Sequence, residues 1–469
     1  MSSVPPKDLL TEIYNVFDPF MPLPAGDPAY VDCSEVRGDG DILTDLGRRV
    51  TLAKVKTCQL YTGHRGVGKS TELLRLQEDL LSKGYFVVYF AADKDDIEPE
   101  DTEYTDILLA CTRHVLEDLK GHGNSKALLE WLRGRLKAFK DAIPELEIEK
   151  FGVEAQIPPL SWIPQFAKIT ANFRAVPGIR QKLRQELDAH TPSLVEALNE
   201  FIRDAKTKLP PPYQDIVIIA DNLDRIAYIK HDANQSSNYD EIFIERVEQL
   251  KALDCHVIYT IPLAMVYSAK ATMLEDNYNK PQVLPMIMVR DRNEIENQAG
   301  LAKMKEIIAK RIEKISLENE PNVGKSLAEA LDIELFENEE TLNQLCLMSG
   351  GHTRNLMQYI QKAIEKTEKL PIRAISVKRA ISETRDTYRN AINEPDQWKV
   401  LAQVALTKRK PNDEKHSLLL LNRSILEYCC LNEDGEIDRW FDIHPVIRGI
   451  QEFKEAKEAL EKLAETTMS

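Results

Sequence analysis

A glycine-rich segment at residues 63–70, GHRGVGKS, constrains this chain more than any other part of its sequence. It matches the pattern G-x-x-x-x-G-K-[ST], in which small residues let consecutive backbone N–H groups turn inward around phosphate oxygens. In this pattern the lysine reaches the β- and γ-phosphates, and the serine hydroxyl ligates Mg²⁺. The sequence therefore predicts a site for ATP and Mg²⁺ that is formed by Gly63, Gly66, Val67, Gly68, Lys69, Ser70 and Thr71.

The residues around this loop give it the setting that phosphate binding requires. Cys58–Tyr61 reads as a short apolar strand, and Tyr85–Phe90 reads as a fully buried one. Between the loop and the second strand, leucines recur at helical spacing. A helix that starts at Thr71 would point its positive N-terminal end at the phosphates. A strand, a loop, a helix and a strand favour nucleotide binding over a chance glycine turn.

A second acidic motif follows another apolar strand at residues 215–225, DIVIIADNLDR. This is the Walker B arrangement, in which an aspartate at the strand tip holds the water shell of Mg²⁺. Asp221 is predicted to take that role. Asp224 is the first candidate to orient or deprotonate the attacking water. The alternative is a buried strand that ends in an ordinary Asp/Asn turn.

Residues 256–262, HVIYTIP, read as a further strand. Thr260 at its end is a candidate γ-phosphate sensor, with a simple strand-end cap as the alternative. Leu284–Val289 reads as another core strand. At least five strands interleaved with helices predict an α/β fold in which a parallel sheet carries helices on both faces.

On these motifs, and on the later segment SGGHTRNL at 349–356, the chain resembles the AAA+ and STAND branch of P-loop ATPases. STAND denotes signal-transduction ATPases with numerous domains. The resemblance covers roughly residues 25–445. It implies that Arg354 reaches the γ-phosphate from a helical lid, with an ordinary surface arginine as the alternative. It also implies that residues 27–38 wrap the adenine, unless they are only an N-terminal arm.

Two departures from that family pattern bear on activity. Many AAA+ enzymes carry Asp-Glu in the Walker B motif, but the second position here is Asn222, and an amide cannot accept a proton from water. From Val247 through Val289 there is no arginine, where an arginine finger is expected. Arg225, Arg290 and Arg292 are candidates to act in trans, but none lies where the family pattern has its finger. These departures favour a slow switch that holds nucleotide over a fast ring motor.

The pattern along the chain predicts four parts. Residues 1–50 form an arm on the adenine side, and 51–290 form the P-loop core with a helical insertion at about 104–208. Residues 291–392 form a helical lid, and 393–469 form a winged-helix-like domain with a hairpin at 424–443. Within the core, the acidic segment 93–103 reads as a solvated loop, with a cation- or partner-contacting loop as the alternative. The apolar, proline-broken segment 157–166 packs on its own domain or meets a partner.

Charge and composition limit the kinds of partner that this chain is expected to bind. The chain has 61 Lys+Arg and 76 Asp+Glu, so its net charge is 61 − 76 = −15, which argues against a generic nucleic-acid coat. Residues 390–469 carry 11 − 15 = −4, which favours a protein contact over DNA readout. The seven cysteines are scattered and contain no C-x-x-C, as in a reduced cytoplasmic protein without a zinc site. No apolar run approaches the ~20 residues that cross a bilayer, so no membrane association is expected.

The leading hypothesis is an ATP-binding, slowly hydrolysing switch that controls a separately encoded effector as a homo- or hetero-oligomer. The chain also resembles standalone bacterial STAND-type ATPases, and this resemblance implies antiphage defence as a context for such a switch. A second hypothesis is a DNA-loading initiator ATPase, because origin-recognition proteins share the order of core, lid and winged helix. Binding of nucleic acid through the winged helix stays open but is not favoured. A third is a scaffold that ATP stabilises without significant turnover.

Overall fold

The structure is a computed structural model in which residues 9–38, 40–131, 134, 177–230, 236–319, 335–410, 416–432 and 434–468 are described. The predicted apolar segment 157–166 lies outside these residues. Amphipathic periodicity also predicts helices at 125–142 and 323–330, and most of the first and all of the second lie outside them as well.

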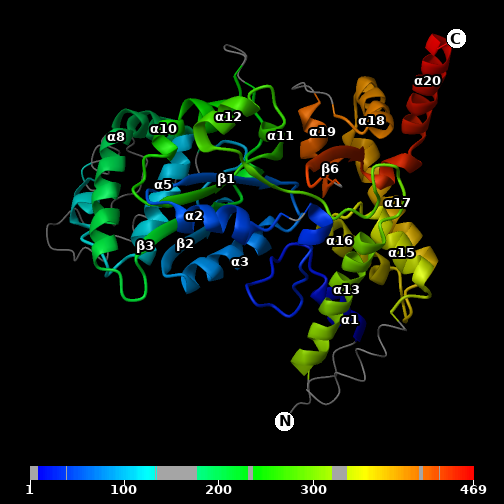
Figure 1. The fold of residues 1–469 in the computed structure, drawn as a ribbon, viewed down its shortest axis with the longest axis horizontal. Helices are drawn as coiled ribbons and strands as arrows, with labels where there is room; N and C mark the ends of the chain where they lie inside the picture. The colour runs from blue at the N-terminus through cyan, green and yellow to red at the C-terminus, as the bar shows by residue number, and fades with distance from the viewer. Residues whose placement is uncertain are drawn as a thin grey trace.

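A parallel five-stranded sheet forms one half of the molecule (Figure 1). Its order is β2-β3-β4-β1-β5, and every neighbouring pair is parallel. The strands are β1 (Cys58–Gly63), β2 (Tyr85–Ala91), β3 (Asp215–Asp221), β4 (His256–Thr260) and β5 (Gln282–Leu284). The predicted α/β fold with a parallel sheet is therefore confirmed. Because all strands run the same way, the ends of β1 and β3 that carry the two predicted motifs lie at one edge of the sheet.

Alternate side chains of the four longer strands, β1 to β4, enter two different hydrophobic clusters, which explains the near-continuous apolar runs. On β3, Ile216 and Ile218 belong to the cluster under α5 (Tyr104–Asp118) and α8 (Pro177–Thr207). Val217 and Ile219 belong to the cluster under α3 (Lys69–Ser82). A strand that is covered on both faces has no solvent-facing positions, so period-two alternation disappears.

Three elements of the core differ from the prediction. β5 ends at Leu284, because the next residues donate to three separate elements: Met286 N to Glu427 O, Ile287 N to Gly351 O and Met288 N to Val36 O. The pattern at 104–120, in the predicted insertion, is typical of an amphipathic helix, but α5 is buried almost all round and packs on β2 as part of the core. The sequence predicts two segments, at 176–187 and 192–209, but α8 runs through Pro192 as one helix, because Leu187 and Leu194 on either side are buried in one cluster.

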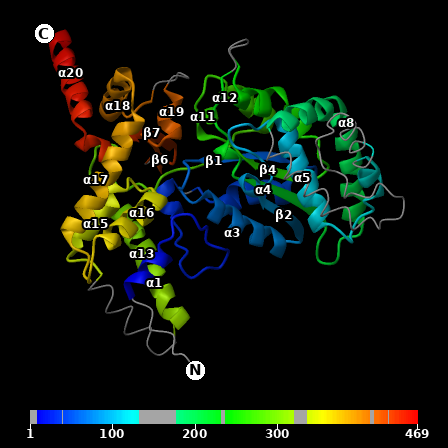
Figure 2. The same cartoon turned by 180° about the vertical axis from the view of Figure 1, so that it is seen from behind.

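The other half of the molecule is mainly helical and shares a single hydrophobic cluster (Figure 2). It contains α1 (Leu9–Val16), α13 (Gln298–Asn319), α15 (Glu339–Met348), α16 (Thr353–Glu365), α17 (Ala374–Ala391), α18 (Pro395–Thr407), α19 (Ser417–Leu421) and α20 (Gln451–Met468). The antiparallel hairpin of β6 (Ile425–Leu431) and β7 (Ile437–Ile443) is found where it was predicted. The boundary expected at 392–393 does not coincide with a break in this cluster, and α1 packs on α13 and α16.

Short elements connect these parts: η1 (Ser34–Arg37), η2 (Leu43–Gly47), α2 (Arg48–Leu52), α4 (Ala92–Asp95), η5 (Leu223–Arg225), α9 (Asn238–Asp240), η6 (Glu241–Glu245), α10 (Val247–Leu250), α11 (Leu263–Val266), α12 (Ala271–Tyr278) and η7 (Pro445–Gly449). Within the described ranges, no helix combines the length and the apolar character that crossing a membrane needs.

Candidate functional site

The predicted phosphate loop connects β1 to α3 and depends on its glycines. Gly63, Gly66 and Gly68 have φ angles of 154°, 93° and 113°, a region that residues with a Cβ rarely adopt. At Gly66 a Cβ would also lie 2.8 Å from the Cβ of Arg354. The local sequence therefore determines the loop conformation, and one of its glycines also allows close packing with a distant helix.

Lys69 is buried and points back over the loop. Its ammonium forms an ion pair with Asp224 at 2.9 Å, and the two side chains are only 5% and 6% exposed. The same nitrogen donates to Gly63 O at 2.9 Å and to His64 O at 3.1 Å. The structure thus brings together two predicted site residues, and a carboxylate neutralises the lysine that is expected to meet the phosphates.

The two predicted Mg²⁺ ligands lie side by side. The Ser70 side chain hydrogen-bonds to Asp221, and the Tyr89 hydroxyl donates to the same carboxylate at 2.9 Å. Burial and the nearby charge of Asp224 raise the pKa of Asp221. Among the described residues, no group of three or more His, Cys, Asp or Glu side chains forms a metal site alone. A hydroxyl and a carboxylate, completed by phosphates and water, are the donors that Mg²⁺ prefers, so the residues fit this ion.

Thr260 is fully buried, and its hydroxyl is used within the sheet. It accepts a hydrogen bond from Leu223 N at 2.9 Å and lies 3.4 Å from Ala220 O, which it faces as a donor. These contacts tie β4 to the turn that carries Asp221 and Asp224. The hydroxyl therefore supports the turn after Asp221, and a role of Thr260 as γ-phosphate sensor stays a prediction.

Arg354 reaches the loop from the start of α16. Its backbone N–H donates to Gly66 O at 3.2 Å, and its Nε donates to Pro19 O at 3.0 Å. The neighbouring Thr353 hydroxyl also donates to Gly66 O, at 2.8 Å. Burial, followed by the charges of Arg225, Arg423 and Arg65, lowers the pKa of Arg354 to about 10. The site therefore gathers several arginines, a charge arrangement that suits a polyanionic ligand.

The C-terminal hairpin also contacts the loop, and no feature of the sequence predicts this contact. Glu427 N on β6 donates to His64 Nε2 at 3.1 Å, and the Tyr428 hydroxyl donates to Gly350 O at 2.8 Å. Burial and the charge of Lys69 lower the pKa of His64 to about 3, so the ring is neutral and its nitrogen can accept. No short motif marks these contacts, because they join residues more than 70 positions apart.

The arginines considered for action in trans have partners within the chain. Arg225 forms an ion pair with Asp93, next to Asn222. Arg290 donates to Glu294 O at 2.9 Å, and Arg292 pairs with Asp438 on β7 at 3.3 Å. Of the three, only Arg225 follows a predicted catalytic carboxylate directly in sequence.

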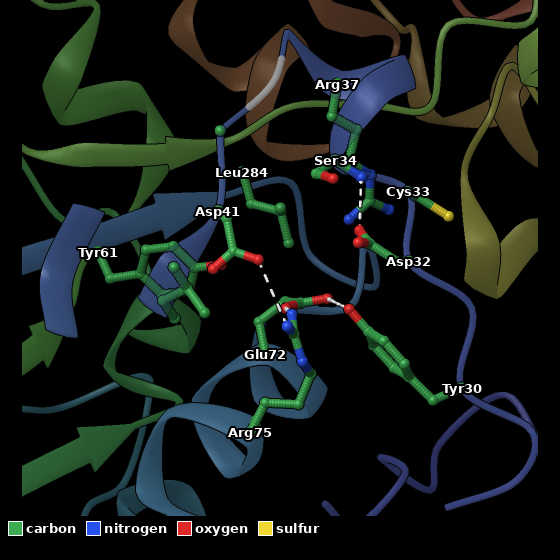
Figure 3. Close-up of a pocket in the computed structure, with 12 residues that line it drawn as sticks. Tyr30, Asp32, Cys33, Ser34, Arg37, Asp41, Tyr61, Glu72, Arg75 and Leu284 are labelled. Atoms are coloured by element: carbon green, nitrogen blue, oxygen red, sulfur yellow. Dashed lines mark hydrogen bonds and ion pairs between the residues drawn. The ribbon is translucent and has the colours of Figure 1, made fainter. Parts of the chain in front are cut away.

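A cavity lies beside α3, against the segment that the resemblance assigns to the adenine (Figure 3). Arg37 from this segment donates to Val67 O at 2.9 Å, which ties the segment to the phosphate loop. Two buried polar atoms of the lining, Arg37 Nε and the Tyr61 hydroxyl, have no hydrogen-bond partner among the described residues. Across the cavity, Arg75 stacks on Tyr30 with its guanidinium carbon 4.7 Å from the ring centre, and it pairs with Glu72.

No protein-family model matches the sequence, and a search of curated proteins gives no match. Similar solved structures include the ORC2 protein of Aeropyrum pernix with ADPNP and ADP, which is 12% identical with a TM-score of 0.40 over 96% of this chain and 98% of that one. A Walker-type ATPase of Pyrococcus abyssi is 10% identical with a TM-score of 0.38, over 92% and 99%. Cdc6p of Pyrobaculum aerophilum is 11% identical with a TM-score of 0.37, over 95% and 98%. Because these scores and identities are low, the function of this chain is inferred from its own site.

Proposed function

We propose that this chain is an ATP-binding, slowly hydrolysing switch of the AAA+/STAND kind. One observation carries the proposal: residues 64–66 of the phosphate loop are bonded both by the lid, through Thr353 and Arg354, and by the C-terminal hairpin, through Glu427. A loop in contact with two other parts of the molecule cannot change its occupancy without affecting their packing.

In this proposal the phosphates of ATP replace Asp224 as the partner of Lys69. Ser70 and Asp221 would hold Mg²⁺, which neutralises phosphate charge when bound. Arg354 lies beside Gly66 and would turn from Pro19 O toward the γ-phosphate. The exchange of one buried partner for another favours a different arrangement of lid and hairpin, and hydrolysis reverses it.

Slow turnover is part of the proposal because two features of the site disfavour rapid ATP hydrolysis. Asn222 supplies no carboxylate at the position where many AAA+ enzymes have one, and Asp224 is paired with Lys69. A separately encoded effector, an oligomeric state and a role in defence rest on the resemblance of the sequence. The initiator alternative would use the C-terminal domain on DNA, but residues 390–469 carry a net charge of −4.

Substitution of Lys69 tests the nucleotide site. Lys69→Ala should abolish ATP binding, measured by titration with a fluorescent ATP analogue, because the loop loses the cation that meets the phosphates. Lys83→Ala is the matched control, since Lys83 lies just beyond the same helix and pairs with Asp79 at the surface. Tight ATP binding by Lys69→Ala would refute the assignment of the site.

The native mass of this chain with any bound partner, measured in ATP and in ADP, tests whether nucleotide controls its assembly. A partner protein that joins or leaves with the nucleotide supports control of a separate effector. A monomer that ignores nucleotide, has no protein partner and is retained by duplex DNA would favour the initiator function. ATP binding without turnover would favour the scaffold.

A further inference from the structure

Asp93 lies at the candidate site although the sequence placed it in a solvated acidic loop. It is in α4, directly after β2, whose last residue Ala91 pairs with Asp221 of β3. Its side chain is only 12% exposed. The expectation of a solvated loop is therefore wrong for this residue, because the parallel register places the end of β2 beside the end of β3.

Both carboxylate oxygens of Asp93 contact residues of the Walker B turn. Asn222 Nδ2 donates to Oδ1 at 2.6 Å, and Arg225 forms an ion pair with Oδ2. Asn222 has a φ of 65°, a left-handed conformation that turns the chain right after Asp221. The Asn222 amide cannot act as a base, but it orients the Asp93 carboxylate, which can.

We propose that Asp93 is a catalytic residue that orients and deprotonates the water attacking ATP, and that Asn222 positions it. The inference rests on the proposed ATPase function. Asp224, the first candidate from the sequence, pairs with Lys69 of the phosphate loop, whereas Asp93 is bonded by Asn222 and Arg225 of the turn that follows Asp221. Arg225 neutralises the Asp93 carboxylate in the nucleotide-free protein, and in this proposal it moves to the phosphates when ATP binds.

The step balances without any further reactant. The water oxygen forms a bond to the γ-phosphorus, and its proton passes to the Asp93 carboxylate. The bond between the γ-phosphorus and the β,γ-bridging oxygen breaks, and its electron pair leaves with ADP. The protonated Asp93 then returns its proton to solvent as inorganic phosphate departs.

Asp93→Asn is the first test, with ATP turnover and ATP affinity measured on the full chain. The expected result is a loss of about 100-fold or more in kcat, the usual contribution of a general base, with ATP affinity nearly unchanged. Asp93→Glu should recover part of the loss, because it restores a carboxylate. Asp95→Asn is the matched control, since Asp95 is exposed in the same short helix.

Asn222→Gly provides a second test that keeps the left-handed turn, because glycine adopts this conformation readily. It removes the amide that holds Asp93 and should lower kcat while sparing KM. It also covers the case in which Asp93→Asn does not fold.

The outcomes separate this inference from the proposed function. If the natural protein turns over ATP and both variants keep full kcat, Asp93 is not the base, while the ATPase proposal stands. If the natural protein shows no turnover above Lys69→Ala, both proposals fall.

Discussion

At the scale of single residues, the ion pair of Lys69 and Asp224 decides how the site meets its ligand. Both side chains are almost fully buried, so each depends on the other for neutralisation. A ligand that binds the Lys69 ammonium must displace the Asp224 carboxylate from it. The pair therefore gives the nucleotide-free protein its own stable arrangement, which a switch requires.

Asp224→Asn should destabilise the nucleotide-free protein by about 3 kcal/mol, because it leaves a buried ammonium without its counter-charge. ATP should then bind more tightly than to the natural protein and restore the lost stability. Urea unfolding with and without ATP measures both effects. Asp79→Asn is a control that removes the partially exposed pair with Lys83, and we expect it to cost less than about 1 kcal/mol. Equal effects of the two substitutions would contradict the role of the buried pair.

At the scale of elements, glycines let strands, loops and helices approach one another closely. Gly351 precedes α16 with a φ of 74°, and a Cβ there would lie 1.7 Å from Ile287 O. Gly435 in the hairpin turn has a φ of 78° but no atom within 4 Å of such a Cβ. The two glycines share a backbone conformation and differ in the space around them.

This pair separates backbone strain from crowding. Gly435→Ala should cost about 1–2 kcal/mol, the penalty of a left-handed residue with a Cβ. Gly351→Ala should cost at least about 4 kcal/mol, because the segment after β5 must move away from the lid. Unfolding free energies in urea compare the two variants. Similar losses would mean that the contact between Gly351 and Ile287 is easily relaxed.

At the scale of the whole molecule, three buried histidines lie where core, lid and C-terminal hairpin meet. Asn355 of α16 contacts His444, and His352 contacts Arg65 O. Burial lowers the pKa of His64 and of His444 to about 3. The charge of Lys69 adds a smaller effect at His64, and the charge of Arg423 does so at His444. Burial also lowers the pKa of His352 well below its usual value. All three are neutral in the folded protein at neutral pH.

The free energy of unfolding should therefore decrease as the pH falls. Below about pH 6.5 the unfolded chain binds a proton at each of these histidines, while in the folded protein His64 and His444 stay neutral until about pH 3. Each histidine should then remove up to about 1.4 kcal/mol per pH unit within this window. His64→Gln keeps a hydrogen-bond acceptor but does not titrate, so its stability should depend less on pH between 6 and 4. An unchanged slope would show that His64 is not a source of the pH dependence.

Local sequence determined the strands, most of the helices and the conformation of the phosphate loop. Gly63, Gly66 and Gly68 allow the positive φ angles of the loop, and Lys69 and Ser70 follow at the spacing that the motif requires. Apolar runs such as Ile216–Ala220 predict buried strands because side-chain burial repeats along the chain itself. The parallel α/β class follows from these runs and the helices between them.

Only the tertiary structure decided which side chains meet at the loop. Asp93 joins Asn222 because two strands pair in parallel register, and Glu427 joins His64 across 363 positions. The Thr260 hydroxyl bonds to the neighbouring strand, and Lys69 pairs with Asp224. No periodic pattern in the sequence encodes the packing that brings these groups together. Contacts between distant segments depend on how elements dock, and that depends on the shape of the whole core rather than on any short stretch of residues.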